Sequence, residues 1–453
     1  MTAPQNRLKL ILVLLALAPF LLLLVGILMI AIWTSNIPDE LDELRESIRR
    51  EGYPITVEEL DEWYSPGPGS EEVGLALTEL ISSYDSELDE NEELLIFNVK
   101  PDIREPLSND EIELASRHLQ NNVDYLRDLH ELIDDYEVVR YPVDVTEGFN
   151  AELSYLAPIR TNTRMMALEA LVAANAGYEL KTGNALVGAF RVAETLRHEP
   201  MLISQLVRVA CLKIAVIASE QAVNRIALTH VELEKLRKTV DNIDCEGLTQ
   251  FGLVGERCLV AWAVQEYGFP LLHDETSSFP YWVLLMKLPG SGRYLDWEEL
   301  HAIEMYTELI ALGNSEPFER KELTQSVERK RNDRLALGNS IANKLTPSMI
   351  RAFEAESRIL ASLGSLSAGL AALQFSYDYE RMPSDLEELV PEYLQEVPTD
   401  PFSGNPLRMR SDEIGFAVYS LGHDRDDDGG IPPPEGKKIT EDGDIVFRIL
   451  LKR

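Results

Sequence analysis

The chain has 453 residues, with 42 lysines and arginines against 77 aspartates and glutamates, and therefore a net charge of −35. A hydrophobic fraction of 45% is too high for a disordered chain. The acidity argues against a nucleic-acid partner, because a phosphate backbone would be repelled, and three cysteines are too few for a disulfide scaffold.

The first predicted element is a membrane anchor. Leu10 to Trp33 contains no charged residue and is long enough to cross a hydrocarbon core of about 30 Å as a helix. Arg7 and Lys9 precede this segment and an acidic stretch follows it, so the positive-inside rule places the N-terminus in the cytoplasm. We therefore predict that residues 1–36 form a cytoplasmic stub and a single-pass anchor in a bacterial inner membrane. Residues 10–33 would contact the lipid bilayer, and the bulk of the chain would be periplasmic.

Residues 37–150 are predicted to form an acidic, helical, membrane-proximal region. From Ile37 to Leu95 there are 19 acidic and 3 basic residues, which favours a solvated acidic face. Thr56 with Glu59, and Ser108 with Glu111, have the spacing of capping boxes and predict two helix starts. The Pro- and Gly-rich stretch at 64–70 predicts a break between helices.

Residues 151–345 are predicted to form an α-helical domain. We expect a turn at 182–184, between helices over 167–181 and 185–197, and a further helix over 201–225. In that last helix, Ile203, Val207 and Ile214 define the predicted core face. Arg208 lies on an adjoining face, where it is predicted to form a buried ion pair, with a ligand-binding role as the alternative. Residues 269–292 are expected to be irregular.

The three cysteines lie in this same helical region, at positions 211, 245 and 258. Their spacing does not match that of metal ligands. A Cys245–Cys258 bridge is one interpretation for an exported domain. Buried thiols on apolar helix faces are the other.

Residues 346–453 change character and are predicted to form a small α+β domain. A long amphipathic helix from Ala352 is followed by three strand candidates at 407–410, 415–421 and 445–451. A long helix packed on an antiparallel sheet is the natural layering for this order of elements. The predicted fold class is thus mainly α, with one small antiparallel sheet at the C-terminal end.

The C-terminal region also resembles a known family. The motifs that carry the resemblance are Val397-Pro398, Asp400-Pro401-Phe402-Ser403-Gly404, Tyr419-Ser420-Leu421-Gly422, Gly429-Gly430 and Asp444-Ile445. In this order they resemble the C-terminal domain of the major pseudopilin of type II secretion systems (type II secretion system protein G), over about residues 350–453. The resemblance implies a calcium ion in the loop of the β-region. The segment 199–208 is similar to uncharacterised membrane-anchored proteins of planctomycete-type bacteria, which imply no activity.

One loop carries candidate metal ligands. Asp424, Asp426 and Asp428 fit the pattern Asp-x-Asp-x-Asp-Gly, in which alternating carboxylates surround a hard cation. A preceding strand and the prolines at 432–434 argue against an EF-hand. By the pseudopilin resemblance, Asp442 or Asp444 would close the site from the far side. We therefore predict a calcium site, against the alternative of a solvated acidic loop without an ion.

No catalytic motif stands out. The seven histidines are scattered, and no His-Glu-x-x-His pattern, nucleophile elbow or phosphate-binding glycine loop is present. We therefore expect a non-enzymatic protein with protein partners in the cell envelope, connected with envelope or secretion assembly. The alternatives are a hydrolase acting on envelope polymers and a genuine minor pseudopilin. A pseudopilin has a glycine cleavage point and a glutamate early in its apolar helix, whereas here Gly26 lies deep inside the apolar segment and no acidic residue follows until Asp39. We therefore expect a pseudopilin-like fold without polymerisation.

Overall fold

The computed structural model describes residues 36–84, 88–97, 103, 107–134, 136, 138–267, 293–335, 341–412, 415–433 and 443–450. The predicted anchor at 10–33 and the irregular segment at 269–292 lie outside the described residues. The described part is mainly helical, with a three-stranded antiparallel sheet near the C-terminus, which confirms the predicted fold class at this level.

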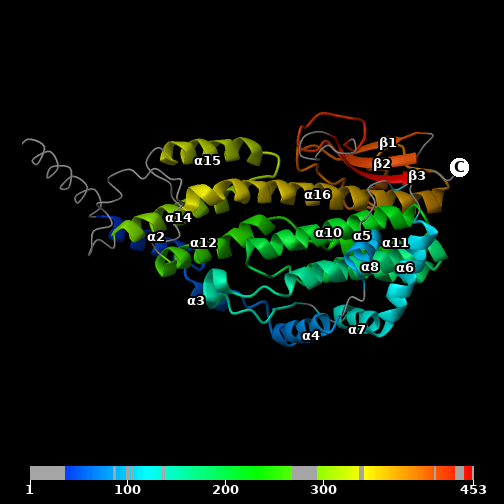
Figure 1. Cartoon of the computed structure of the whole chain (residues 1–453). Coiled ribbons are helices and arrows are strands. Elements are labelled where there is room, and N and C mark those ends of the chain that lie inside the picture. The colour runs from blue at the N-terminus through cyan, green and yellow to red at the C-terminus, as the bar shows by residue number, and fades with distance from the viewer. Residues whose placement is uncertain are drawn as a thin grey trace, which may run out of the picture.

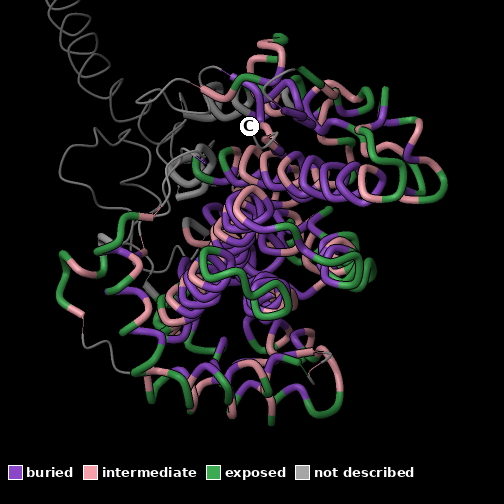
Figure 2. The backbone as a smooth tube through the Cα atoms, turned by 90° about the vertical axis from the view of Figure 1, so that its right-hand side faces the viewer, coloured by how far each residue is buried: buried purple, intermediate pink, exposed green. Residues whose placement is uncertain are grey.

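The helices form layers along an elongated body (Figure 1). The sheet lies on one side of α16, and α10, α11 and α12 pack on the other; α8 and α9 follow, and α4 and α7 lie farthest from the sheet. Buried backbone concentrates where these layers meet (Figure 2). The α-helices are α2 (Ile37–Arg50), α3 (Val57–Trp63), α4 (Ser70–Ser82), α5 (Glu90–Phe97), α6 (Asn109–Asn121), α7 (Val123–Asp134), α8 (Leu156–Ala176), α9 (Glu179–Glu194), α10 (Leu202–Val223), α11 (His230–Asp241), α12 (Leu248–Tyr267), α14 (Arg293–Leu312), α15 (Arg320–Leu335) and α16 (Ile341–Tyr379). Short 3-10 helices are η1 (Val145–Asn150) and η3 (Glu387–Leu389).

The sheet is a simple antiparallel meander. Its strands β1 (Arg408–Ser411), β2 (Gly415–Ser420) and β3 (Ile445–Leu450) lie within a residue of the predicted positions and pair in the order β1-β2-β3. The central strand β2 is buried along its whole length, and β3 alternates between buried and half-buried residues. Its inward side chains, such as Phe447 and Ile449, join the same apolar core as Leu366 and Leu370 of α16.

The outer edge of β3 is covered by α10. The backbone N–H of Arg448 donates to Glu220 Oε1 (2.9 Å), and the N–H of Leu450 donates to Asn224 Oδ1 (2.7 Å). The guanidinium of Arg448 also pairs with Glu220. These contacts satisfy strand groups that would otherwise offer a pairing edge to another chain. They also join the predicted helical region directly to the C-terminal strands.

Two helix starts follow the predicted caps. The Thr56 hydroxyl accepts a hydrogen bond from the N–H of Glu59, and Ser108 with Glu111 forms a full capping box. The predicted break at 64–70 also lies between α3 and α4. These predictions succeed because a cap depends on residues only three positions apart.

The predicted turn at 182–184 is wrong. These residues lie inside α9, and the chain breaks earlier, at Gly177, whose φ of 79° is the left-handed conformation of a helix C-terminus. Gly183 serves close packing instead, because a Cβ there would lie 2.7 Å from Glu232 Cγ of α11. The glycine was a signal of helix contact, which the local sequence cannot distinguish from a turn.

The predicted core face of α10 is also wrong. Ile203 is exposed, and Val207 and Ile214 are only half-buried. The buried face carries polar groups instead, among them Gln205 and Arg208. Arg208 does form the predicted buried ion pair, with Glu194 of α9 at 2.8 Å.

The structure decides between the two interpretations of the cysteines. All three cysteines are buried free thiols, so no Cys245–Cys258 bridge forms.

Within the described residues, α10 and the segment Ser348–Tyr379 of α16 are long and apolar enough to cross a membrane by length and composition. Of their most apolar windows, 56% and 78% are buried inside the structure, as in core helices. The single-pass topology remains a prediction.

Candidate metal centre

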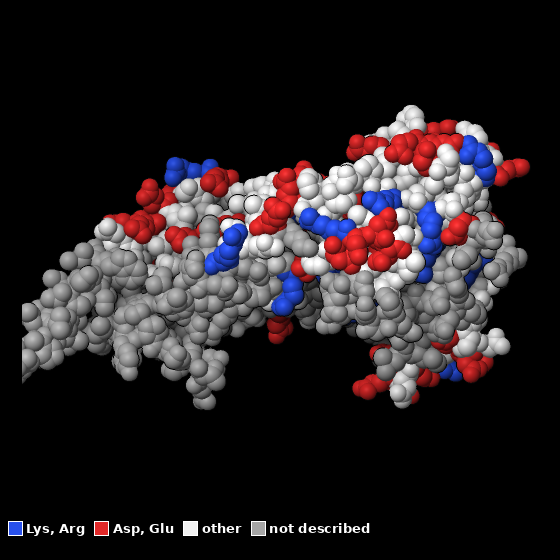
Figure 3. Space-filling view, turned by 90° about the horizontal axis from the view of Figure 1, so that it is seen from above, with Lys and Arg blue, Asp and Glu red and all other residues white. Residues whose placement is uncertain are grey.

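The acidic loop begins where β2 ends. Gly422 has a φ of 69°, and a Cβ there would lie 2.7 Å from the carbonyl oxygen of Gly443. A glycine is therefore needed for the loop to turn back close to the residues that lead into β3. Figure 3 shows acidic side chains gathered in a patch, with basic side chains beside it, on the side of the molecule that carries the sheet.

Three of the predicted ligands come together. One carboxylate oxygen from each of Asp424, Asp426 and Asp428 lies within 4.8 Å of the others. Asp424 and Asp428 are half-buried and Asp426 is exposed. Calcium binds oxygens at about 2.3–2.6 Å, so oxygens on opposite sides of one ion are about 5 Å apart. The spacing of the three carboxylates is therefore compatible with one shared cation.

Asp444, the residue before β3, faces the same loop, although it is not one of the three residues whose carboxylate oxygens lie within 4.8 Å of one another. Its Oδ2 accepts a hydrogen bond from the N–H of Gly430 (2.7 Å), and Oδ2 of Asp424 accepts one from the N–H of Gly443 (3.1 Å). The second oxygens of both residues, and Oδ2 of Asp428, are buried without a hydrogen-bond partner in the described part of the chain. Three buried carboxylate oxygens are thus left open to a ligand, and in Asp424 and Asp444 the other oxygen of the carboxylate is held by a backbone N–H. Asp442 lies outside the described residues.

The electrostatics of the loop favour a positive ligand. The pKa of Asp444 is raised to about 6, mainly by burial and also by the negative charges of Asp427 and Asp428, while the hydrogen bond from Gly430 opposes the rise. Burial and the two neighbouring negative charges disfavour the ionised carboxylate when no cation is present. A bound divalent ion would reverse the balance.

Asp427 has a different role from its neighbours. Its carboxylate pairs with Arg408 of β1 and accepts hydrogen bonds from the Tyr419 hydroxyl (3.2 Å) and the N–H of Gly429 (3.0 Å). Neighbouring aspartates of the loop therefore point in different directions in the structure. Positions 424, 426 and 428 face one another, whereas Asp427 ties the loop to the sheet.

Asp400 positions the start of the loop and was not predicted as a functional residue. It is buried and accepts hydrogen bonds from Phe402 N–H (3.0 Å), Ser403 Oγ (2.8 Å), Ser420 Oγ (2.7 Å) and Leu421 N–H (3.2 Å). One carboxylate thereby fixes both the Asp-Pro turn and the end of β2. The recurrence of Asp400 and Ser420 in the pseudopilin-like motif was the signal in the sequence.

The loop also contacts the helical body. Arg425, with a φ of 66°, donates a hydrogen bond to the carbonyl of Phe318 (2.6 Å), in the connection between α14 and α15.

Comparison of the chain with protein-family models, with curated proteins and with solved structures finds no match. The pseudopilin resemblance therefore rests on the sequence motifs described above.

Proposed function

We propose that this protein is a non-enzymatic, membrane-anchored, extracytoplasmic component of envelope or secretion-related assemblies. In this proposal the helical region contacts protein partners, and a pseudopilin-like C-terminal module is stabilised by calcium. The observation that carries the proposal is the set of unpartnered carboxylate oxygens on Asp424, Asp428 and Asp444. Buried polar atoms normally have partners, so the oxygens left open on the loop and on the facing Asp444 indicate a missing ligand.

Calcium is the cation that fits this donor set. The donors are carboxylate oxygens on a loop, and hard oxygen ligands suit calcium or magnesium. Magnesium retains several waters and demands near-octahedral geometry, whereas calcium accepts a larger, irregular set of protein oxygens. An ion bound only by the folded loop would stabilise the native state by linkage, because the unfolded chain does not hold the aspartates together.

Calcium is therefore expected to bind the purified full-length protein and to raise its free energy of unfolding. Linkage predicts a gain of about 2.7 kcal/mol at a free calcium concentration about a hundredfold above Kd. Isothermal titration measures the binding, and urea unfolding with and without chelator measures the gain. We expect the double variant Asp424→Asn, Asp428→Asn to lose both.

Asp427→Asn is the control, because it removes one negative charge from the same loop but its carboxylate faces Arg408. It should retain calcium binding. Absence of calcium binding by the wild-type protein at millimolar concentration would remove the basis of the proposed module. Equal loss in the control and in the double variant would show only a general effect of charge.

The proposed topology has its own test. Arg7 and Lys9 on one side of the apolar segment, with the acidic stretch on the other, support export of the C-terminal bulk. An alkaline phosphatase fused after residue 453 is expected to be active, because this reporter folds only outside the cytosol. A reporter that is active only in the cytosol, fused at the same point, is the control. Activity of the cytosolic reporter alone would contradict the orientation and with it the extracytoplasmic function.

A further inference from the structure

A second site lies far from the aspartate loop in the sequence. A cavity of about 380 Å³ opens where the α2–α3 connection, the end of α9, α10 and the start of α12 meet. This volume lies in the range of about 300–1,000 Å³ that is typical of small-molecule sites. The cavity has one aromatic wall and one polar wall, and their chemistry indicates what could bind.

The aromatic wall comes from three rings on different segments. Trp63 at the end of α3 and Phe251 of α12 pack with ring centroids 5.1 Å apart and their planes tilted by 34°. Tyr53, from the α2–α3 connection, lines the same cavity. All three side chains are half-buried, so they offer ring surface to a ligand without being loose.

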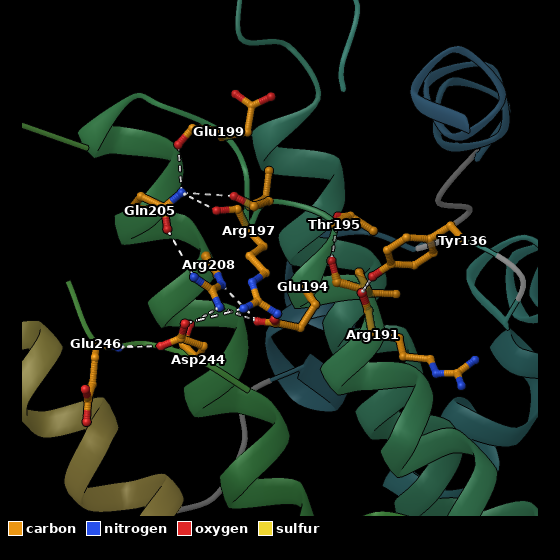
Figure 4. Close-up of polar contacts among 12 residues, drawn as sticks. Tyr136, Arg191, Glu194, Thr195, Arg197, Glu199, Gln205, Arg208, Asp244 and Glu246 are labelled. Atoms are coloured by element: carbon orange, nitrogen blue, oxygen red, sulfur yellow. Dashed lines mark hydrogen bonds and ion pairs between the residues drawn. The ribbon is translucent and has the colours of Figure 1, made fainter. Parts of the chain in front are cut away.

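The polar wall is rigid because its central side chain, Arg208, is held by hydrogen bonds within the protein. The guanidinium of Arg208, only 2% exposed, donates to Glu194 Oε1 (2.8 Å) and to the carbonyl of Asp244 (2.7 Å). Gln205 donates in turn to the carbonyls of Glu199 (2.7 Å) and Leu196 (3.0 Å). Figure 4 shows Arg208, Glu194 and Asp244 converging, with the Glu199 side chain pointing away from them. This wall is built before any ligand arrives.

The charges around the cavity balance one another. The lining includes two positive side chains, Arg197 and Arg208, and two negative ones, Asp244 and Glu246. Arg197 already lies 3.4 Å from the carboxylate of Asp244. A phosphate would meet these carboxylates as well as the guanidinium groups, and an organic cation would meet two arginines. The lining therefore disfavours a strongly charged ligand of either sign.

Several polar groups in the cavity remain available. Within the described residues, the His198 imidazole and the Tyr53 hydroxyl have no hydrogen-bond partner. Burial lowers the pKa of His198, and the positive charges of Arg197 and Arg208 lower it further. The ring is therefore neutral at neutral pH and offers one donor and one acceptor.

We propose that this cavity binds a neutral saccharide of one or two rings. A sugar presents C–H groups on its faces and hydroxyl groups around its rim. The faces match the aromatic wall, and the hydroxyls match a rim that mixes donors and acceptors, including His198, Arg197 and Glu246. The binding chemistry is independent of the calcium proposal. Only the source of the sugar, an envelope glycan, rests on the proposed extracytoplasmic location.

The test is saturation-transfer NMR and isothermal titration on the purified full-length protein. The probes are glucose, N-acetylglucosamine, cellobiose and chitobiose, with inorganic phosphate and tetramethylammonium as charged comparisons. We expect at least one of the four sugars to bind at millimolar concentration or below. His198→Ala and Tyr53→Ala should each weaken that binding at least tenfold. Tyr178→Ala, which alters an exposed aromatic residue outside the cavity lining, should leave it unchanged.

Each result decides the proposal. No binding by any sugar, or binding of phosphate or tetramethylammonium alone, would overturn it, as would unchanged sugar affinity in both cavity variants. Calcium titration of the same samples reports separately on the aspartate loop, so failure of one site is distinguishable from failure of the other. Cleavage of chitobiose or cellobiose would support the saccharide site and contradict the non-enzymatic function.

Discussion

Replacing Glu356 with alanine is expected to lower the free energy of unfolding by about 3–5 kcal/mol, because it leaves a buried positive charge without its partner. Glu356, in α16, is fully buried and accepts hydrogen bonds from Arg320 Nη1 (2.6 Å) and from the backbone N–H of Thr249 (2.9 Å) and Gly247 (3.3 Å). One carboxylate thus joins α15, α16 and the start of α12. Urea unfolding of the full-length protein measures the loss.

The matched control is Glu234→Ala, which breaks an exposed ion pair with Lys238 on α11. An exposed pair of this kind contributes little to stability, because solvent screens it. The double variant Arg320→Met, Glu356→Leu should lose less stability than Glu356→Ala alone, because no charge remains buried. If Glu356→Ala cost no more than Glu234→Ala, the carboxylate would not join the three helices as described.

The helix caps and strands were predictable because they depend on neighbouring residues. The capping pairs at Thr56 and Ser108, the short β-rich run of β2 and the alternation in β3 are complete within a few positions of the chain. The aspartates at 424, 426 and 428 belong to the same class, since they alternate within five residues and lie close together in the structure. Local chemistry of this kind can be interpreted before any tertiary contact is known.

Features that depend on distant partners could not be predicted. The polar face of α10 is buried because Arg208 meets Glu194 on α9 and the carbonyl of Asp244 beyond α11. Hydrophobicity alone predicts the wrong buried face for a helix that buries arginine and glutamine. The cavity has the same origin, since Tyr53, His198 and Phe251 are brought together only by the folding of the chain. No spacing in the sequence indicates such a site.

Glu199→Ala should be comparably destabilising, with a loss of about 3–5 kcal/mol, because several buried donors would lose one acceptor. Glu199 is fully buried between α9 and α10 and accepts hydrogen bonds from the hydroxyls of Tyr64, Tyr155 (2.5 Å) and Ser204 (3.3 Å). Tyr64 lies in the acidic region 37–150, so the carboxylate ties that region to the helical core. Urea unfolding at neutral pH measures the effect, with Glu234→Ala, which breaks the exposed pair with Lys238, as the control.

Glu199→Gln removes the charge and keeps one of the two acceptor oxygens. Tyr64 and Tyr155 donate to different oxygens of Glu199, so the amide oxygen still accepts from one tyrosine, while the other faces the amide nitrogen, which donates. Burial raises the pKa of Glu199 in the folded protein, against the opposing hydrogen bonds from Tyr155 and Tyr64. A raised carboxyl pKa means that the stability contributed by this group is full below its unfolded pKa and falls as pH rises through its folded pKa. Relative to wild type, Glu199→Gln should therefore become more stable as pH rises from 4 to 8. A difference that is constant across this range would show that Glu199 has no raised pKa and that its charge costs the folded state nothing.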